Sequence, residues 1–144
     1  MSEIELQQHA AAPRPIREGL MQMEPPRLIG TRCSECGTVT FPAREFCPAC
    51  DSEILPARIP LSESGIIYSY TVVYQAPPGR KTPYVLAYVD LESGVRVLAQ
   101  IDTDPQQLAI GSAVTLDIRA VGHENGHPLI GYVFVPKRNA KEAI

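Results

Sequence analysis

The stretches CSEC at 33–36 and CPAC at 47–50 decide how this chain folds, and ten residues separate them. A C-x-x-C pair places two sulfurs on one tight turn, and two such turns facing each other supply the ligands of a tetrahedral metal site. Gly37 permits a turn behind the first pair, and Pro48 stiffens the second. The predicted ligands are all four cysteines of the chain, namely Cys33, Cys36, Cys47 and Cys50.

The spacing favours zinc, although iron uses the same four-sulfur geometry in rubredoxin-type sites. Such a site is closed, so we expect a structural metal and no metal catalysis. Two disulfides are the main alternative. Residues 1–26 show no apolar leader segment, so we expect a cytoplasmic protein with reduced cysteines.

Length and charge limit the remaining possibilities. With 144 residues the chain can form a metal-stapled module and one small barrel. A formal charge of −3 argues against a general nucleic-acid surface. No apolar run approaches the roughly 18 residues that a membrane-spanning helix requires, so we expect no membrane contact.

The segment before the cysteines predicts a short helix. Proline is tolerated in a first helical turn, so Pro13–Pro15 is a possible start, and the prolines at 25 and 26 end it. A helix here places Ile16, Leu20 and Met23 on one face. This stripe packs on the chain's own core or docks into the groove of a partner.

Beyond the cysteines the pattern is that of strands. Residues 27–60 are expected to form the metal ribbon, with Phe41 and Phe46 covering the sulfurs. From Gly65 onward, apolar residues recur with a period of two, and Asp104–Pro105 marks one short helical turn. The predicted strands cover 66–74, 84–90, 95–101, 113–121 and 128–135, with the last turn at 122–126.

This order predicts a mainly β fold: an N-terminal helix, a rubredoxin-like zinc ribbon and a five-stranded OB-fold barrel, although another small barrel fits the alternation. The predicted divisions are a tail and docking helix (1–26), the ribbon (27–60), the barrel (61–136) and a C-terminal tail (137–144).

The best candidate for binding is the loop 75–83 between the first two barrel strands. Its Arg80 and Lys81 lie on a proline-rich arm and can hold a phosphate with little ordering cost, or they are simply a solvated basic turn. Lys137 and Arg138 form a second basic cluster after the last strand. No catalytic set emerges, because the histidines at 9, 123 and 127 have no nucleophile near them in the sequence.

The chain resembles a family of acyl-CoA-associated proteins in which a rubredoxin-like zinc ribbon precedes an OB-fold. The resemblance covers nearly everything after Pro15, with Asp51 standing where such knuckles commonly have glycine. It rests on Cys33-x-x-Cys36-Gly37, Phe41-Pro42, Cys47-Pro48-x-Cys50, Tyr68-Ser69-Tyr70-Thr71-Val72-Val73, Pro83-Tyr84 and Gly94-Val95-Arg96-Val97-Leu98-Ala99.

The resemblance implies a subunit that is not catalytic alone. Members of the family accompany thiolase-like enzymes, acyl-CoA hydratases or aldolases in hetero-oligomers, including one in the breakdown of aromatic compounds. It further implies structural zinc and coenzyme A or acyl-CoA as ligand, with Arg80, Lys81, Lys137 and Arg138 as candidate contacts. Two other readings stay open: a ribbon and OB module that binds single-stranded nucleic acid, and an iron-containing electron carrier.

Overall fold

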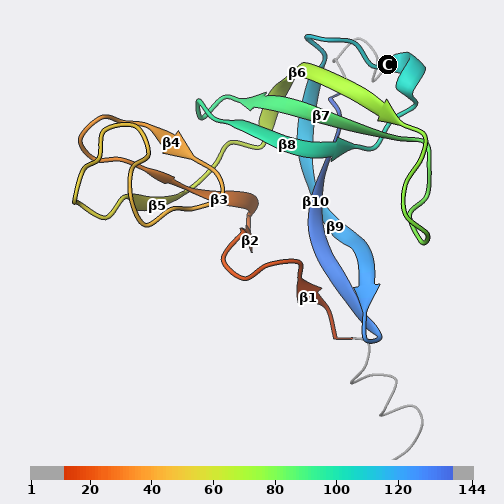
Figure 1. Ribbon diagram of the computed structural model, residues 1–144, viewed down its shortest axis with the longest axis horizontal. Coiled ribbons are helices and arrows are strands. Elements are labelled where there is room, and N and C mark those ends of the chain that lie inside the picture. The colour runs from red at the N-terminus through yellow and green to blue at the C-terminus, as the bar shows by residue number, and fades with distance from the viewer. Residues whose placement is uncertain (1–11, 138–144) are drawn as a thin grey trace, which may run out of the picture.

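The computed structural model describes residues 12–137, and nearly all of its regular elements are β-strands (Figure 1). The strands are β1 Arg14–Pro15, β2 Met21–Met23, β3 Pro26–Arg32, β4 Val39–Thr40, β5 Ala57–Pro60, β6 Ser64–Val73, β7 Tyr84–Leu91, β8 Arg96–Ile101, β9 Ala113–Glu124 and β10 His127–Pro136; a 3-10 turn, η1, covers Pro105–Gln107. No helix between residues 12 and 137 is long and apolar enough to cross a membrane.

The strands β6 to β10 close into the predicted five-stranded barrel. Their order is β10-β8-β7-β6-β9, and the antiparallel pairing of β9 with β10 completes the circle. A parallel contact between Phe134 and Ile101 joins β10 to β8. The mainly β class and the barrel expected from the sequence are therefore confirmed.

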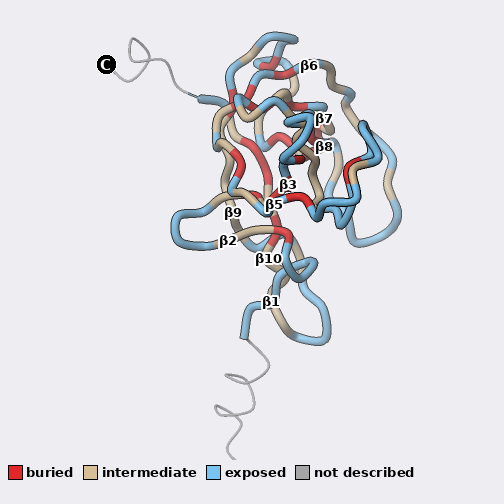
Figure 2. The backbone as a smooth tube through the Cα atoms, turned by 90° about the vertical axis from the view of Figure 1, so that its left-hand side faces the viewer, coloured by how far each residue is buried: buried red, intermediate tan, exposed pale blue. Residues whose placement is uncertain are grey.

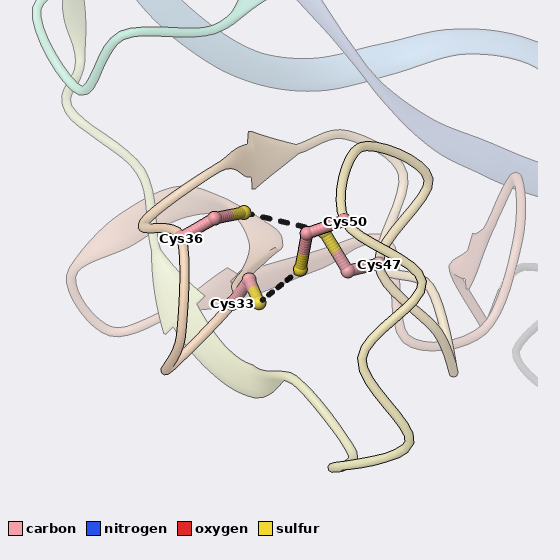
Figure 3. A group of neighbouring side chains, drawn as sticks. All are labelled: Cys33, Cys36, Cys47 and Cys50. Atoms are coloured by element: carbon pink, nitrogen blue, oxygen red, sulfur yellow. Dashed lines mark hydrogen bonds between the residues drawn. The ribbon is translucent and has the colours of Figure 1, made fainter.

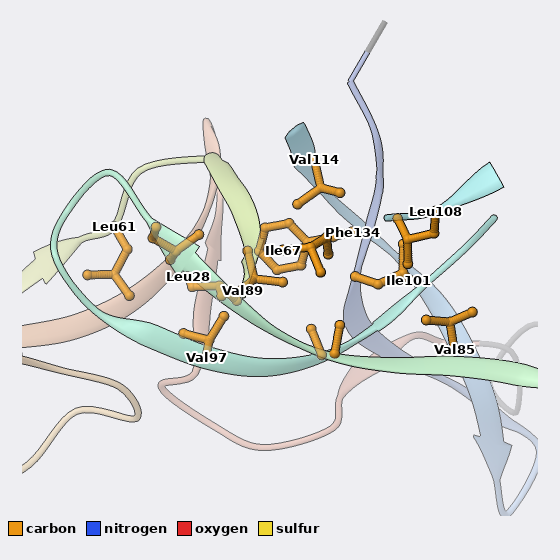
Figure 4. Packing of buried hydrophobic residues seen from close by; sticks show 13 residues of the cluster. Leu28, Leu61, Ile67, Val85, Val89, Val97, Ile101, Leu108, Val114 and Phe134 are labelled. Carbon is orange, nitrogen blue, oxygen red and sulfur yellow. The ribbon is translucent and has the colours of Figure 1, made fainter. Parts of the chain in front are cut away.

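The barrel core follows the alternation of the strands. Val85, Ala87 and Val89 of β7 are buried, as predicted, and so are the inward residues of β8. Phe134 of β10 is fully buried and packs with the aliphatic side chains of the cluster (Figure 4). Buried residues concentrate in the barrel strands and β3, whereas loops and turns are largely exposed (Figure 2).

A bulge changes which side chains of β6 point inward. The register to β7 shifts between Ile67 and Ser69. Ile67 is 1% exposed, whereas Ile66 is 53% exposed, yet beyond the bulge Tyr70 and Val72 pack against the core. Because a bulge inserts one unpaired residue, it reverses the alternation that the sequence alone displays.

The ribbon and the barrel share a core through β3. This strand pairs with β2, β4 and β5, and its Leu28 packs with Leu61 in the same cluster as the barrel residues. A side chain at Gly30 would clash with the Thr40 carbonyl oxygen of β4. Glycine therefore allows β3 to approach β4 closely.

The N-terminal helix expected from the sequence is wrong. Within residues 12–26 the chain instead forms β1, parallel to β10, and β2, antiparallel to β3. Gly19 has a φ of 76°, which a right-handed helix does not allow. A helix of about ten residues is marginal in water, and here the neighbouring strands offer backbone hydrogen-bond partners that replace it.

The last two strands are longer than predicted and extend beyond the barrel as an arm (Figure 1). The turn lies at Asn125–Gly126 and not at 122–126, with φ angles of 50° and 80°. Positive φ at both positions is typical of the two-residue type I′ hairpin turn, which Asn-Gly favours. The helical turn at Asp104–Pro105 is confirmed, because Asp104 accepts a hydrogen bond from the Gln106 N–H.

Candidate functional site

The four cysteine sulfurs lie together between the two knuckles (Figure 3). All are within 4.8 Å of one another, and the pairs Cys33–Cys50 and Cys36–Cys47 are 3.6 and 3.5 Å apart. These separations are too long for disulfides. They suit a tetrahedron of zinc–sulfur bonds, whose edge is about 3.8 Å for bonds of about 2.3 Å.

Each knuckle turns through a residue with positive φ directly after its second cysteine. Gly37 has a φ of 77° and Asp51 a φ of 56°. The first knuckle is fixed further by hydrogen bonds from the Cys33 N–H to the Thr38 carbonyl and from the Gly37 N–H to the Cys33 carbonyl. Asp51 therefore occupies a conformation that glycine adopts at lower cost.

The electrostatics of the cluster favour a cation. A hydrogen bond between the Cys36 sulfur and the Thr38 hydroxyl, with the Thr38 backbone N–H, lowers the Cys36 pKa to about 6. The Ser52 backbone N–H lowers the pKa of Cys50, but the sulfurs of Cys36 and Cys33 outweigh it and raise this pKa to about 12. Thiolates that ionise first oppose further negative charge, and a bound divalent metal relieves that repulsion. The site fits zinc.

The two phenylalanines predicted to cover the sulfurs lie in the segment between the knuckles. Phe46 is 59% exposed. Phe41 packs edge-on against Tyr132 of β10, with ring centroids 5.8 Å apart. Phe41, directly after β4, thus connects the ribbon to the barrel.

A groove of about 940 Å³ lies where the loop 74–83, the arm and the barrel meet. It is lined by Leu86 of β7, Leu98 of β8 and, from the last two strands, Val121 and Tyr132. The proline-rich loop contributes Arg80 and Lys81 to the lining. OB-folds bind ligands on the face of their second and third strands. The loop between strands 1 and 2 and the loop between strands 4 and 5 flank that face.

Arg80 is held at the rim of this groove. The loop turns at Gly79, which has a φ of 93°, and the Arg80 N–H donates to the Pro77 carbonyl. The guanidinium lies 4.3 Å from the centroid of the Tyr84 ring and donates to the Gln100 side chain at 3.1 Å. Its positive charge is therefore positioned before any ligand arrives.

The other predicted residues lie elsewhere. Lys137 donates to the Ser64 hydroxyl, at the start of β6, whereas Arg80 lies beside the far end of that strand, which is about 30 Å long. Arg138 lies outside the described residues. Of the predicted docking residues, Leu20 is buried, Met23 is 56% exposed and Ile16 lines the groove.

Within residues 12–137 no histidine is hydrogen-bonded to a serine, threonine or cysteine. His127 contacts the Ala12 carbonyl through Nδ1, and His123 is exposed on the arm. The sequence did not indicate that Val121 and Tyr132 line the groove. The Asn125–Gly126 turn signal predicts the longer hairpin, but it does not place that hairpin beside the loop 74–83.

Comparison with known proteins shows relatives of the same architecture. The model of the ChsH2 rubredoxin-like zinc ribbon domain matches residues 24–56, and that of the ChsH2 C-terminal OB-fold domain matches residues 58–119. A DUF35 domain-containing scaffold protein of Methanocaldococcus jannaschii is 41% identical over 78% of this chain and 83% of its own length.

The names of two further similar proteins describe enzymes or enzyme subunits. The benzoylsuccinyl-CoA thiolase subunit BbsA of Thauera aromatica is 36% identical over 76% of each chain. The solved structure of the Ltp2-ChsH2(DUF35) aldolase superposes with a TM-score of 0.63 at 32% identity, over 76% of this chain and 84% of that one.

Replacing Asp51 with glycine should stabilise the zinc-loaded protein by about 0.5–1 kcal/mol, because glycine adopts positive φ without a Cβ penalty. Thermal unfolding would show this as a higher midpoint. The control is Ala49→Gly in the same knuckle, where φ is not positive and glycine should lower the midpoint. A lower midpoint for Asp51→Gly would contradict the role given to this position.

Zinc affinity should fall as the pH falls. At about pH 8 zinc must displace the proton of Cys50, and below about pH 6 it must also displace that of Cys36, so the decline should steepen there. Competition with a chromophoric chelator measures the affinity. Thr38→Val should raise the Cys36 pKa and move the steepening to higher pH; an affinity independent of pH would contradict this account.

Proposed function

This chain belongs to the DUF35 family, in which a ChsH2-type zinc ribbon precedes an OB-fold, and we propose that it is an accessory subunit of a thiolase-like or aldolase-type acyl-CoA enzyme. In this proposal it docks on the catalytic chain and binds the coenzyme A part of the substrate. The reacting groups then belong to the partner.

The observation that carries the proposal is the composition of the groove. Coenzyme A joins anionic phosphates to a long, mostly neutral pantetheine arm. The groove presents Arg80 and Lys81 at its rim and the apolar side chains of Leu86, Leu98 and Val121 inside. Charge-assisted hydrogen bonds to phosphate suit a guanidinium that is already held in place.

The metal has a structural role in this proposal. Four thiolates complete the coordination of zinc, which offsets half of their negative charge and cross-links the two knuckles. The sulfurs of Cys33 and Cys47 come from buried residues, whereas Cys36 and Cys50 are exposed. The ribbon then presents a fixed surface, which a loop of this length without metal would not.

The docking surface that we propose includes the second knuckle and the loop after it. Phe46, Ile54 and Leu55 are 59%, 53% and 69% exposed. Large apolar side chains gathered on one short segment of a surface commonly mark a protein interface. Met23 adds a further exposed apolar side chain on β2. The narrower proposal of benzoylsuccinyl-CoA thiolysis rests on the similarity to BbsA alone.

Co-expression with the acyl-CoA enzyme encoded next to this chain's gene should give one complex that elutes together. Phe46→Ser and Leu55→Ser together should weaken the complex at least tenfold, because each removes a buried apolar contact. Ile110→Ser, at an exposed residue outside the ribbon, is the control. Full activity of the catalytic chain alone would contradict the accessory role.

Replacing both Arg80 and Lys81 with alanine should raise the dissociation constant for coenzyme A about tenfold or more, because two charged contacts to phosphate are lost. Isothermal titration of the zinc-loaded chain, alone and in its complex, measures the change. Arg44→Ala, on the exposed surface of the ribbon, should leave the constant unchanged. Equal affinities for wild type and the double variant would contradict this placement of the phosphates.

A further inference from the structure

A row of side chains crosses the outer face of the barrel at the end where β7 turns into β8. Ile66 of β6 stands opposite Asp90 of β7, which stands opposite Arg96 of β8. Tyr68 is the extra residue at the bulge of β6, and the Arg96 guanidinium carbon lies 3.3 Å from the centroid of its ring. A bulge can re-aim one side chain, and here it brings a tyrosine to the arginine. Ile66, Tyr68, Asp90 and Arg96 are together called the end patch.

The end patch has the composition of a protein-binding surface. Ile66 and Tyr68 are 53% and 51% exposed, although the solvated face of a strand usually carries polar residues. Arg96 donates to both carboxylate oxygens of Asp90, at 2.6 and 3.1 Å, so its side chain is already held in place. Tyrosine and arginine are enriched among the residues that contribute most to binding in protein interfaces. A hollow of about 330 Å³ beside the ion pair offers room for an anchoring side chain.

The pantetheine arm of the proposed ligand ends at this patch. Arg80 donates to the side chain of Gln100, which stands opposite Leu86, so the phosphates lie at that end of the two strands. From Leu86 to Asp90 the strand spans about 13 Å. The pantetheine arm has about as many bonds in line as four residues of extended chain, which gives it a reach of about 13–14 Å. Laid along the outer face, it brings its thiol end to the Asp90–Arg96 pair.

The end patch lies at the same end of the barrel as the ribbon. The Ser62 N–H donates to the Ser93 hydroxyl at 2.6 Å, and the Ser93 N–H donates to the Ser62 hydroxyl at 3.0 Å. These bonds fasten the turn of the β7–β8 hairpin to the segment that leaves the ribbon. Figure 1 shows this hairpin at the ribbon end of the barrel. A single partner can therefore reach both the ribbon and the end patch.

We propose that the end patch docks the catalytic chain of the acyl-CoA enzyme at the opening of its active site. This rests on the proposed function, in which this chain binds coenzyme A and the partner reacts with the thioester. Because the thioester leaves the outer face at the Asp90–Arg96 pair, the reacting groups of the partner must meet it there. A catalytic chain seated on the patch also covers Ile66 and Tyr68, which removes apolar surface from water on both sides.

Ile66→Thr with Tyr68→Thr should raise the dissociation constant of the complex with the co-expressed acyl-CoA enzyme at least tenfold, because both apolar anchors are lost. Threonine keeps the preference for strand structure. Titration of the zinc-loaded variant should show an unchanged affinity for coenzyme A, since neither residue lines the groove. The control is Tyr74→Thr, at a tyrosine that is 70% exposed beyond the other end of β6, and it should leave the complex intact.

A photoreactive benzoylphenylalanine in place of Tyr68 locates the docked surface. In the complex it should cross-link to the catalytic chain at residues around the opening of the active site. The same group in place of Tyr74 should give no cross-link there.

Three results would overturn the inference while coenzyme A still binds and the proposed function stands. The first is a complex of unchanged strength in the double variant. The second is a set of cross-links that reach only a part of the catalytic chain remote from its active site. The third is a set of cross-links between two copies of this chain, which would make the end patch a self-association surface. If wild type forms no complex or binds no coenzyme A, the proposed function itself fails.

Discussion

One strand, β3, belongs to the ribbon and to the barrel core at the same time. Leu28 in its middle is fully buried in the cluster that includes Phe134, and Cys33 follows its last residue. The ribbon's own strands are too short to form a core. The metal site therefore depends on the barrel for its anchoring, and the contact of Phe41, which follows β4, with Tyr132 of β10 adds a second connection between ribbon and barrel.

This connection gives the two ends of the molecule different surfaces. The second knuckle displays exposed apolar residues and metal ligands, whereas the groove displays fixed positive charge beside an apolar floor. A subunit of this kind can bind a protein with one part and a ligand with another. Phe41 of the ribbon is in direct contact with Tyr132, which also lines the groove.

The sequence alone predicted the features that depend on local patterns. The cysteine spacing defined the knuckles, and the period of two in β7 and β8 identified the inward residues correctly. The prediction of an N-terminal helix was wrong because a short apolar stripe does not indicate that β3 and β10 offer backbone hydrogen-bond partners to residues 14–23. The bulge in β6 depends on its pairing with β7, so the alternation there gave no sign of it.

The groove was predicted only in part for the same reason. Arg80 and Lys81 were visible because a basic pair on a proline-rich loop is a local signal. The strip of Leu86, Tyr88 and Leu98 lay within strands whose inward faces had already been assigned. The groove over these side chains forms because the arm and the loop 74–83 flank them. Such an arrangement depends on contacts between residues far apart in the chain.

The seam between β8 and β10 has a consequence for how the chain folds. It rests on one parallel pair, Phe134 with Ile101, whereas the hairpins β7–β8 and β9–β10 close over short turns. Closing a longer loop costs more conformational entropy, so local hairpins form before distant strands meet. On the ribosome, β10 emerges after every other strand of the barrel. Until then the core cluster lacks Phe134, and a chain that stops short of this residue leaves apolar core surface uncovered, which favours aggregation.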